Sequence, residues 1–283
     1  PPVMLHHIPR FLAAKTEKGI KVALVVVDGL SLDQWLVIRE VLEQQNKRLT
    51  FHEDAVFAWV PSVTSVSRQA TFAGKPPMFF PASIQTTDKE PAYWEQFWSD
   101  QGIPPNQVMY MKGLGDNSVE PVTDSISPNI RVVGLVVDKV DRIMHGMELG
   151  TAGMHNQVRQ WSHQSYLSHL FDGLHDLGFS IFLTSDHGNI EAKGFGRPTE
   201  GAAADLRGER VRVYPDRNLR AQVKAAFPTA IEWEPNGLPN NYLPLIAPSR
   251  NAFIRSGESI VGHGGIALEE LIVPFVQIER GTI

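Results

Sequence analysis

The 283-residue chain is 42% hydrophobic and 20% charged, which excludes an intrinsically disordered protein and predicts one large domain or a core with an insertion. Its net charge of −5 provides no overall basic field for nucleic acid, and its longest apolar run, "VALVVV" at 22–27, is too short to span a membrane. The absence of cysteine excludes disulfides, thiolate nucleophiles and sulfur-ligated zinc, so any metal must be held by oxygen and imidazole.

The ends and the composition also give an expectation about context. The chain begins Pro1-Pro2 without a methionine and shows no signal peptide, so we expect a processed form or a fragment of a longer protein. A chain without cysteine is compatible with a reducing compartment, and we expect a cytoplasmic protein.

Short apolar runs alternate with amphipathic stretches along the whole chain. Such Val/Ile/Leu runs predict an α/β fold in which a mostly parallel sheet lies between helices. The clearest helix is expected at about 154–177, with its histidines at the surface. Glycine, proline and charge dominate 189–260, which we interpret as an insertion or cap on a single domain of 1–283. The runs expected to form core strands are 21–29, 106–112, 131–138, 179–186 and 270–278.

Acidic or imidazole side chains follow several of these strands. In an open α/β sheet, ligands bind at the carboxyl ends of the strands, so these groups can converge. Singly, each has a plainer explanation as a turn residue, a helix cap or a structural histidine. Together they predict one or two sites for a divalent metal such as zinc or manganese. The residues are Asp28, Asp138, Asp141, His145, Asp186, His187 and His263.

A hydroxyl-rich helix start lies in "WVPSVTSVSRQATFAGKPP" at 59–77. A hydroxyl there is ordinarily a helix cap, but next to metal ligands Thr64 becomes a candidate nucleophile at a helix end that favours anions. Its rivals are Ser62, Ser65 and Ser67. Arg68, four residues after Thr64, would share its face of a helix and could contact two phosphate oxygens; the alternative is a solvated surface arginine.

A local basic strip is the one feature that suggests nucleic acid. Arg207, Arg210 and Arg212 lie in "LRGERVRVY", where 210 and 212 would point the same way on a strand and could follow a phosphate backbone. The alternative is a solvated edge strand protected by its charges.

The order of these residues along the chain resembles that in the alkaline phosphatase superfamily: Asp28, Thr64, Asp141 with His145, Asp186 with His187, and His263. The tail "HGGIALEELIVPF" resembles the PglZ domain of phage growth limitation (BREX) systems. The resemblance runs from Asp28 to His263. It implies two divalent metals, zinc or manganese. One would lie among Asp141, His145 and His263, and the other among Asp28, Asp186, His187 and the Thr64 hydroxyl. Ser67-Arg68 stands where many phosphodiesterases carry Asn-His.

The resemblance implies a metal-dependent phosphodiesterase or nuclease-like hydrolase that acts in phage defence or nucleotide signalling. The expected partners are a phosphate-ester substrate, which includes nucleic acid or a nucleotide, and other defence-system proteins. Two alternatives stay open. One is phosphomonoester hydrolysis or phosphate transfer within a sugar phosphate, and the other is a metal-binding scaffold of a defence complex with a vestigial site.

Overall fold

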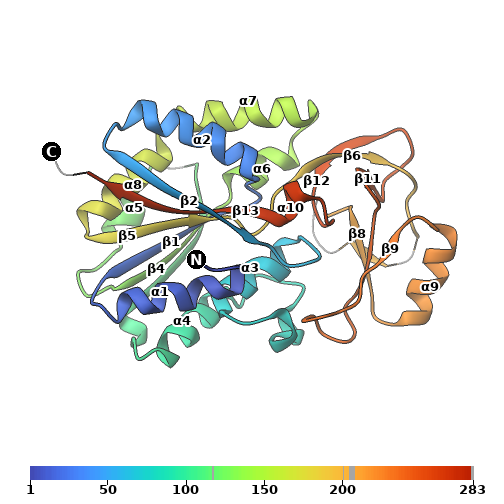
Figure 1. Ribbon diagram of the computed structural model, residues 1–283, viewed down its shortest axis with the longest axis horizontal. Helices are drawn as coiled ribbons and strands as arrows, with labels where there is room; N and C mark the ends of the chain where they lie inside the picture. Colours follow the sequence, from blue (N-terminus) through green and yellow to red (C-terminus); the bar gives the residue numbers. More distant parts are fainter. Residues whose placement is uncertain (117, 200, 204–207, 282–283) are drawn as a thin grey trace.

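A computed structural model describes residues 1–116, 118–199, 201–203 and 208–281, and its centre is a six-stranded sheet (Figure 1). The strand order is β2-β13-β5-β1-β4-β3. β5, β1, β4 and β3 are parallel neighbours, whereas β13 is antiparallel to both β2 and β5. The expected α/β fold with a mostly parallel sheet is therefore confirmed. The strands are β1 Lys21–Val27, β2 Leu49–Phe57, β3 Val108–Leu114, β4 Val132–Val137, β5 Phe179–Thr184 and β13 Ile272–Arg280.

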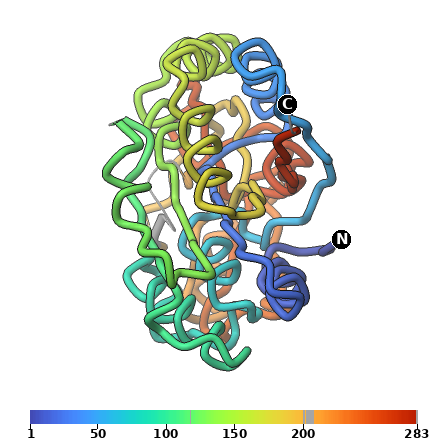
Figure 2. The backbone as a smooth tube through the Cα atoms, turned by 90° about the vertical axis from the view of Figure 1, so that its left-hand side faces the viewer, coloured from blue at the N-terminus to red at the C-terminus, as the bar shows by residue number. Residues whose placement is uncertain are grey.

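Strand β1 shows why both faces of the sheet are covered. Ala23, Val25 and Val27 belong to one hydrophobic cluster and the alternate residues Val22 and Leu24 to another, so its side chains enter two cores. The two helical layers lie on opposite sides of the sheet in Figures 1 and 2. One layer contains α1 Ile8–Thr16, α3 Thr64–Ala73 and α4 Glu90–Asp100; the other contains α2 Leu32–Gln45, α5 Glu120–Asp124, α7 Gly150–Ser162 and α8 Tyr166–Asp176.

The single helix expected at about 154–177 is wrong, because the chain forms two helices there, α7 and α8. The break falls in the polar run 163–165, where Ser165 adopts a positive φ of 64°. The turn lets α7 pack on α2 while α8 packs on β5. The hydrophobic spacing continued across the break, so periodicity alone did not reveal it.

Two smaller sheets form between β5 and β13 in sequence and lie at the right of Figure 1. One has the strand order β7-β8-β10-β9 and the other β11-β6-β12. That 189–260 is an insertion or cap stays a prediction. The elements here are β6 Ile190–Gly194, β7 Ala202–Ala203, β8 Val211–Tyr214, α9 Arg217–Ala226, β9 Ile231–Glu232, β10 Leu243–Ile246, β11 Asn251–Ala252 and β12 Ser259–Gly262.

The remaining elements are short helices. They are α6 Lys139–His145, α10 Leu268–Leu271 and the 3-10 helices η1 Leu5–His7, η2 Pro77–Phe79, η3 Pro81–Ser83 and η4 Pro105–Gln107.

Of the helices in the described part of the chain, none has the length and apolar character needed to cross a membrane.

Candidate active site

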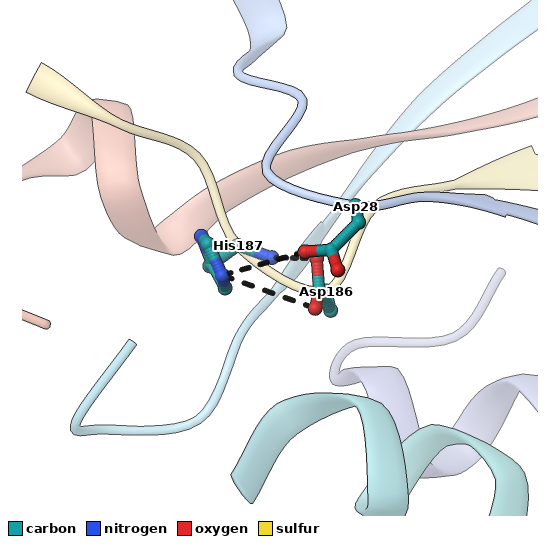
Figure 3. Close-up of side chains that lie close together, drawn as sticks. All are labelled: Asp28, Asp186 and His187. Carbon is teal, nitrogen blue, oxygen red and sulfur yellow. Dashed lines mark hydrogen bonds and ion pairs between the residues drawn. The ribbon is translucent and has the colours of Figure 1, made fainter. Parts of the chain in front are cut away.

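The carboxyl ends of β1 and β5 bring three potential metal ligands together (Figure 3). Asp28 follows β1, and Asp186 and His187 follow β5. One ligand atom from each of the three lies within 4.8 Å of the other two, and no other set of three His, Asp or Glu residues in the described ranges does so. All three side chains are almost fully buried. The two strands are parallel neighbours, so their ends place these residues side by side.

Unsatisfied atoms in this group show that it fits a cation. Asp186 Oδ1 accepts hydrogen bonds from the backbone N–H groups of Gly29 and His187, both at 3.0 Å. Its other oxygen, Oδ2, and Asp28 Oδ1 are buried and have no hydrogen-bond partner among the described residues. Each lies 3.8 Å from His187 Nε2. Buried polar atoms are rarely left unpaired unless an ion or water completes them.

The tautomer of His187 also fits a metal ligand. Its Nδ1 lies 2.9 Å from the carbonyl oxygen of Gly188, so Nδ1 carries the proton and donates to that carbonyl. Nε2 is left with a lone pair that faces the two carboxylates. A ligating histidine is commonly oriented in this way, by a hydrogen bond from its other ring nitrogen.

Burial makes the ionised forms of the two aspartates unfavourable. Burial raises the pKa of Asp186 well above its usual range, and the neighbouring Asp28 carboxylate raises it further. Two carboxylates with oxygens within 4.8 Å of each other disfavour each other's ionised form, and a dication would instead favour it.

Thr64 is the first residue of α3 and reaches the same group. Its Oγ1 donates a hydrogen bond of 3.0 Å to His187 Nε2. Two of its rivals have structural roles: Ser62 Oγ donates to the Gly265 carbonyl at 2.9 Å, and Ser67 Oγ accepts the Trp59 N–H at 3.1 Å. Both are fully buried. Ser65, by contrast, lines the pocket next to Thr64.

The other predicted metal ligands are arranged less tightly. Asp141 Oδ2 lies 3.2 Å from His145 Nε2, as their spacing of four residues on α6 predicts. Burial, the largest single influence, opposes ionisation of Asp141, but the hydrogen bond from His145 and the nearby histidines together outweigh it and lower the pKa of Asp141. His263 is buried and stacks on His187 with ring centroids 3.9 Å apart, and its Nδ1 lies 2.9 Å from the Ser62 carbonyl. Asp141, His145 and His263 do not form a group as compact as the first.

Arg68 is not the solvated surface arginine that was one of its two interpretations. Its side chain is buried and donates from Nη1 to Asp28 Oδ2 at 2.5 Å and from Nε to Glu90 Oε1 at 2.8 Å. Burial opposes its charge, but the carboxylates of Asp28 and Glu90 outweigh burial and raise its pKa. Nothing in the sequence marks Glu90 as a partner of Arg68, because it looks like an ordinary acid in the first turn of a helix. A contact between Arg68 and phosphate stays a prediction.

A pocket of about 320 Å³ opens beside Thr64. The residues that line it combine acidic, basic and hydroxyl groups. They are Asp28, Thr64, Ser65, Arg68, Gln85, Thr86, Thr87, Asp141 and His145.

Asp138, the alternative to Asp141 as a metal ligand, follows β4, and its Oδ1 lies 3.8 Å from Arg68 Nη1. Burial and the charge of Asp28 raise the pKa of Asp138 to about 6.

Comparison with known proteins shows which family the chain belongs to. Residues 9–278 match the family described as the BREX system PglZ alkaline phosphatase-like domain. The chain belongs to this family. No match was found among curated proteins.

Solved structures share the fold of this PglZ domain at low identity. Murine ectonucleotide pyrophosphatase/phosphodiesterase 5 is 14% identical, with a TM-score of 0.62 over 90% of this chain and 87% of that chain. The inactive threonine-to-alanine form of the murine protein, in complex with AMP, is 12% identical, with a TM-score of 0.60 over 91% and 87%. Phosphonoacetate hydrolase from Sinorhizobium meliloti, in complex with phosphonoacetate, is 13% identical, with a TM-score of 0.52 over 91% and 89%.

The predicted basic strip of the PglZ domain is wrong for the residues that the structure describes. Arg210 and Arg212 are buried: Arg210 pairs with Glu270, and Arg212 donates to the Phe253 carbonyl. The edge-strand alternative is wrong as well, because β8 lies between β7 and β10. Arg207 lies outside the described residues. Buried arginines bound to a carboxylate and to carbonyl groups cannot follow a nucleic-acid backbone.

Proposed function

We propose that this PglZ domain is a metal-dependent phosphoric-ester hydrolase, most specifically a phosphodiesterase, with Thr64 as its nucleophile. One observation carries the proposal: the Thr64 hydroxyl lies against His187 Nε2, beside the two unpartnered oxygens of Asp28 and Asp186. The family membership supports a phosphoester hydrolase of the alkaline phosphatase superfamily. The murine structure that is inactive after a threonine-to-alanine change, and that binds AMP, supports both a threonine nucleophile and a nucleotide-like ester.

The residues that would hold metal form two sets. Asp28, Asp186 and His187, with the Thr64 hydroxyl, would hold one divalent ion, zinc or manganese. A second ion would be held by Asp141, His145 and His263. Bound ions of this kind lower the pKa of a hydroxyl group and neutralise the negative charge of a phosphate ester.

The chain's own groups then account for the reaction. Thr64 Oγ1 loses its proton and attacks phosphorus, a new Oγ1–P bond forms as the ester P–O bond breaks, and the leaving oxygen takes up a proton, so the proton count is unchanged. Water later breaks the Oγ1–P bond, which releases the phosphate product and returns a proton to Oγ1. The phosphoryl group would lie at the N-terminus of α3, where backbone N–H groups and the helix dipole favour an anion. Asp186, held by two backbone N–H groups, keeps the ligand group fixed.

The biological setting is proposed from the family description. We infer a role in phage defence or nucleotide signalling, with a nucleotide or nucleic-acid phosphodiester as substrate and other defence-system proteins as partners. A cytoplasmic location is part of the same proposal.

Hydrolysis of bis-p-nitrophenyl phosphate and p-nitrophenyl phosphate, with zinc or manganese present, tests the proposal. We expect diester hydrolysis that Thr64→Ala abolishes without loss of folding, because removing a hydroxyl at a helix start costs only about 0.5–2 kcal/mol. Thr71→Ala is the matched control, since Thr71 lies on the same helix and its hydroxyl bonds only to the Ser67 carbonyl among the described residues.

The outcomes separate the alternatives. Near-normal turnover in Thr64→Ala, with loss in Ser65→Ala, would overturn the choice of nucleophile. Hydrolysis of the monoester alone would favour a phosphomonoesterase. Metal binding without hydrolysis of either ester would favour a scaffold with a vestigial site.

A further inference from the structure

A buried ion pair outside the pocket connects the loops that carry both stacked histidines. Arg210 and Glu270 come from different parts of the chain, and their side chains are 1% and 0% exposed. Arg210 Nε donates to Glu270 Oε1 at 2.8 Å, and its Nη2 donates to Glu270 Oε2 at 3.1 Å. The remaining donor capacity of Arg210 goes to the carbonyls of Asn251 and Ser249, at 2.5 and 2.9 Å. The guanidinium therefore holds the carboxylate in one orientation.

The same carboxylate binds the loop that follows His263. Glu270 Oε1 accepts the Gly265 N–H at 2.8 Å and Oε2 accepts the Ala267 N–H at 2.9 Å. The backbone N–H of Arg210 donates to the His263 carbonyl at 3.3 Å, so both partners of the pair contact this loop. A Cβ at Gly265 would lie 2.4 Å from Arg210 Nη2, so the close approach requires glycine there.

The backbone of Glu270 also reaches the other histidine. Its carbonyl accepts the Gly188 N–H at 2.9 Å, directly after His187. A Cβ at Gly188 would lie only 1.9 Å from the Glu269 carbonyl oxygen, so this approach is equally tight. Glu270 thus contacts the chain just after each of the two histidines, whose rings are stacked at an interplanar angle of 14°.

From these contacts we propose that Arg210 and Glu270 are positioning residues, which hold His187 and His263 at the spacing that metal binding needs. The consequence for metal rests on the proposed function, whereas the effect on ring spacing does not. Neither residue lines the pocket described beside Thr64. Residues that orient metal ligands typically contribute on the order of 10- to 100-fold in metal affinity.

The test compares Glu270→Gln and Arg210→Lys with Arg220→Lys in the whole chain. Arg220 is a matched control: it is also a buried arginine, it pairs with Glu232 at 3.3 Å, and it donates to the Trp233 carbonyl. Glutamine keeps one carbonyl-type acceptor for the loop but loses the charge that Arg210 binds. The first measurement is the spacing of the His187 and His263 rings, by crystallography of the metal-free variants.

The second measurement is the zinc affinity by calorimetry, with the melting temperature of each metal-free variant. We expect the ring stack to open and zinc affinity to fall on the order of 10- to 100-fold in Glu270→Gln and Arg210→Lys. Arg220→Lys should lower only the melting temperature. An unchanged ring stack and unchanged zinc affinity, alongside a lower melting temperature, would overturn the proposal and leave the pair a purely structural one.

The two proposals fail in different ways. If the wild-type chain binds no zinc, the proposed function fails, and the ring spacing in the metal-free variants still decides the positioning role. If wild type binds zinc and Glu270→Gln binds it equally well with the rings in place, only the positioning role fails.

Discussion

The variant Asp186→Asn tests two effects of the Asp186 carboxylate. Its burial destabilises the metal-free protein, and its oxygen contributes to the proposed metal binding. Asp186 is fully buried; Oδ1 accepts two backbone N–H groups, and Oδ2 has no partner among the described residues. Asparagine keeps an acceptor for both N–H groups and replaces the unpartnered oxygen by an amide that can donate toward Asp28 or His187. Without metal, we therefore expect the variant to be more stable than wild type at neutral pH.

The size of the expected stabilisation follows from the unpartnered oxygen of Asp186. A buried polar group without a partner destabilises a protein by about 1–3 kcal/mol, so the free energy of unfolding of the variant should rise by about this amount. For a chain of this size a change of about 1–3 kcal/mol corresponds to roughly 2–5 °C in melting temperature. With zinc at 1,000 times its Kd for wild type the order should reverse, because the ion then stabilises wild type by about 4.1 kcal/mol, whereas the variant has lost a ligand.

The pH dependence of folding stability independently predicts that the metal-free variant is the more stable of the two. Burial and Asp28 raise the folded-state pKa of Asp186, while an unfolded aspartate titrates near about 3.9. Between these two values the folded state holds the extra proton, so metal-free wild type loses stability as pH rises above about 4. The gap between variant and wild type should therefore widen with pH.

Melting curves at pH 4 and pH 8, with chelator and with zinc, measure both effects. Asp54→Asn, at an exposed position of β2, is the control for loss of a carboxylate alone. A metal-free Asp186→Asn variant that melts below wild type at pH 8 would refute the view that this charge is uncompensated.

Three further predictions follow from the same geometry. Asp141→Ala should lose at least one metal equivalent and Asp138→Ala less, because only Asp141 contacts His145 at 3.2 Å; equal loss by elemental analysis would contradict the choice of Asp141. Diester hydrolysis should be weak at acidic pH and rise toward alkaline pH, because histidine ligands must be neutral and free imidazole titrates near about 6.5; activity that survives verified metal removal would refute the mechanism. Gly188→Ala should destabilise the chain by about 3 kcal/mol or more, because its Cβ would meet the Glu269 carbonyl at 1.9 Å, whereas Gly146→Ala, with its nearest atom at 3.9 Å, should change the urea midpoint little.

Five of the six strands of the central sheet and one candidate metal-ligand group could be predicted from the sequence for a shared reason, whereas β2, most of whose residues are exposed, was not among the expected core strands. A strand buried on both faces must be apolar along its whole length, so runs such as 22–27 stand out. A carboxylate directly after such a run must lie at the sheet edge. Asp28 and Asp186 converge because β1 and β5 are parallel neighbours, which the topology of an α/β fold favours.

The contacts that orient the site could not be predicted, because they join residues distant in sequence. Arg68 binds Glu90, 22 residues away on another helix, and Arg210 binds Glu270, 60 residues away. Nothing in either local sequence marks these pairs. The turn at Ser165 was missed for the opposite reason: it is local, but the apolar spacing passed through it.

Burial of arginine explains why the predicted basic strip was wrong and why the solvated-surface alternative for Arg68 does not hold. Arginine is almost never fully buried unless it is paired, so a sequence containing Arg68, Arg210 and Arg212 favours exposed positions. In the structure, carboxylates or carbonyl oxygens satisfy each of them. At Arg68 the pairing has a chemical consequence, because its contact with Asp28 Oδ2 leaves the other oxygen, Oδ1, directed toward the ligand group. The arginine therefore compensates part of the negative charge of Asp28 and selects which of its oxygens can bind a metal.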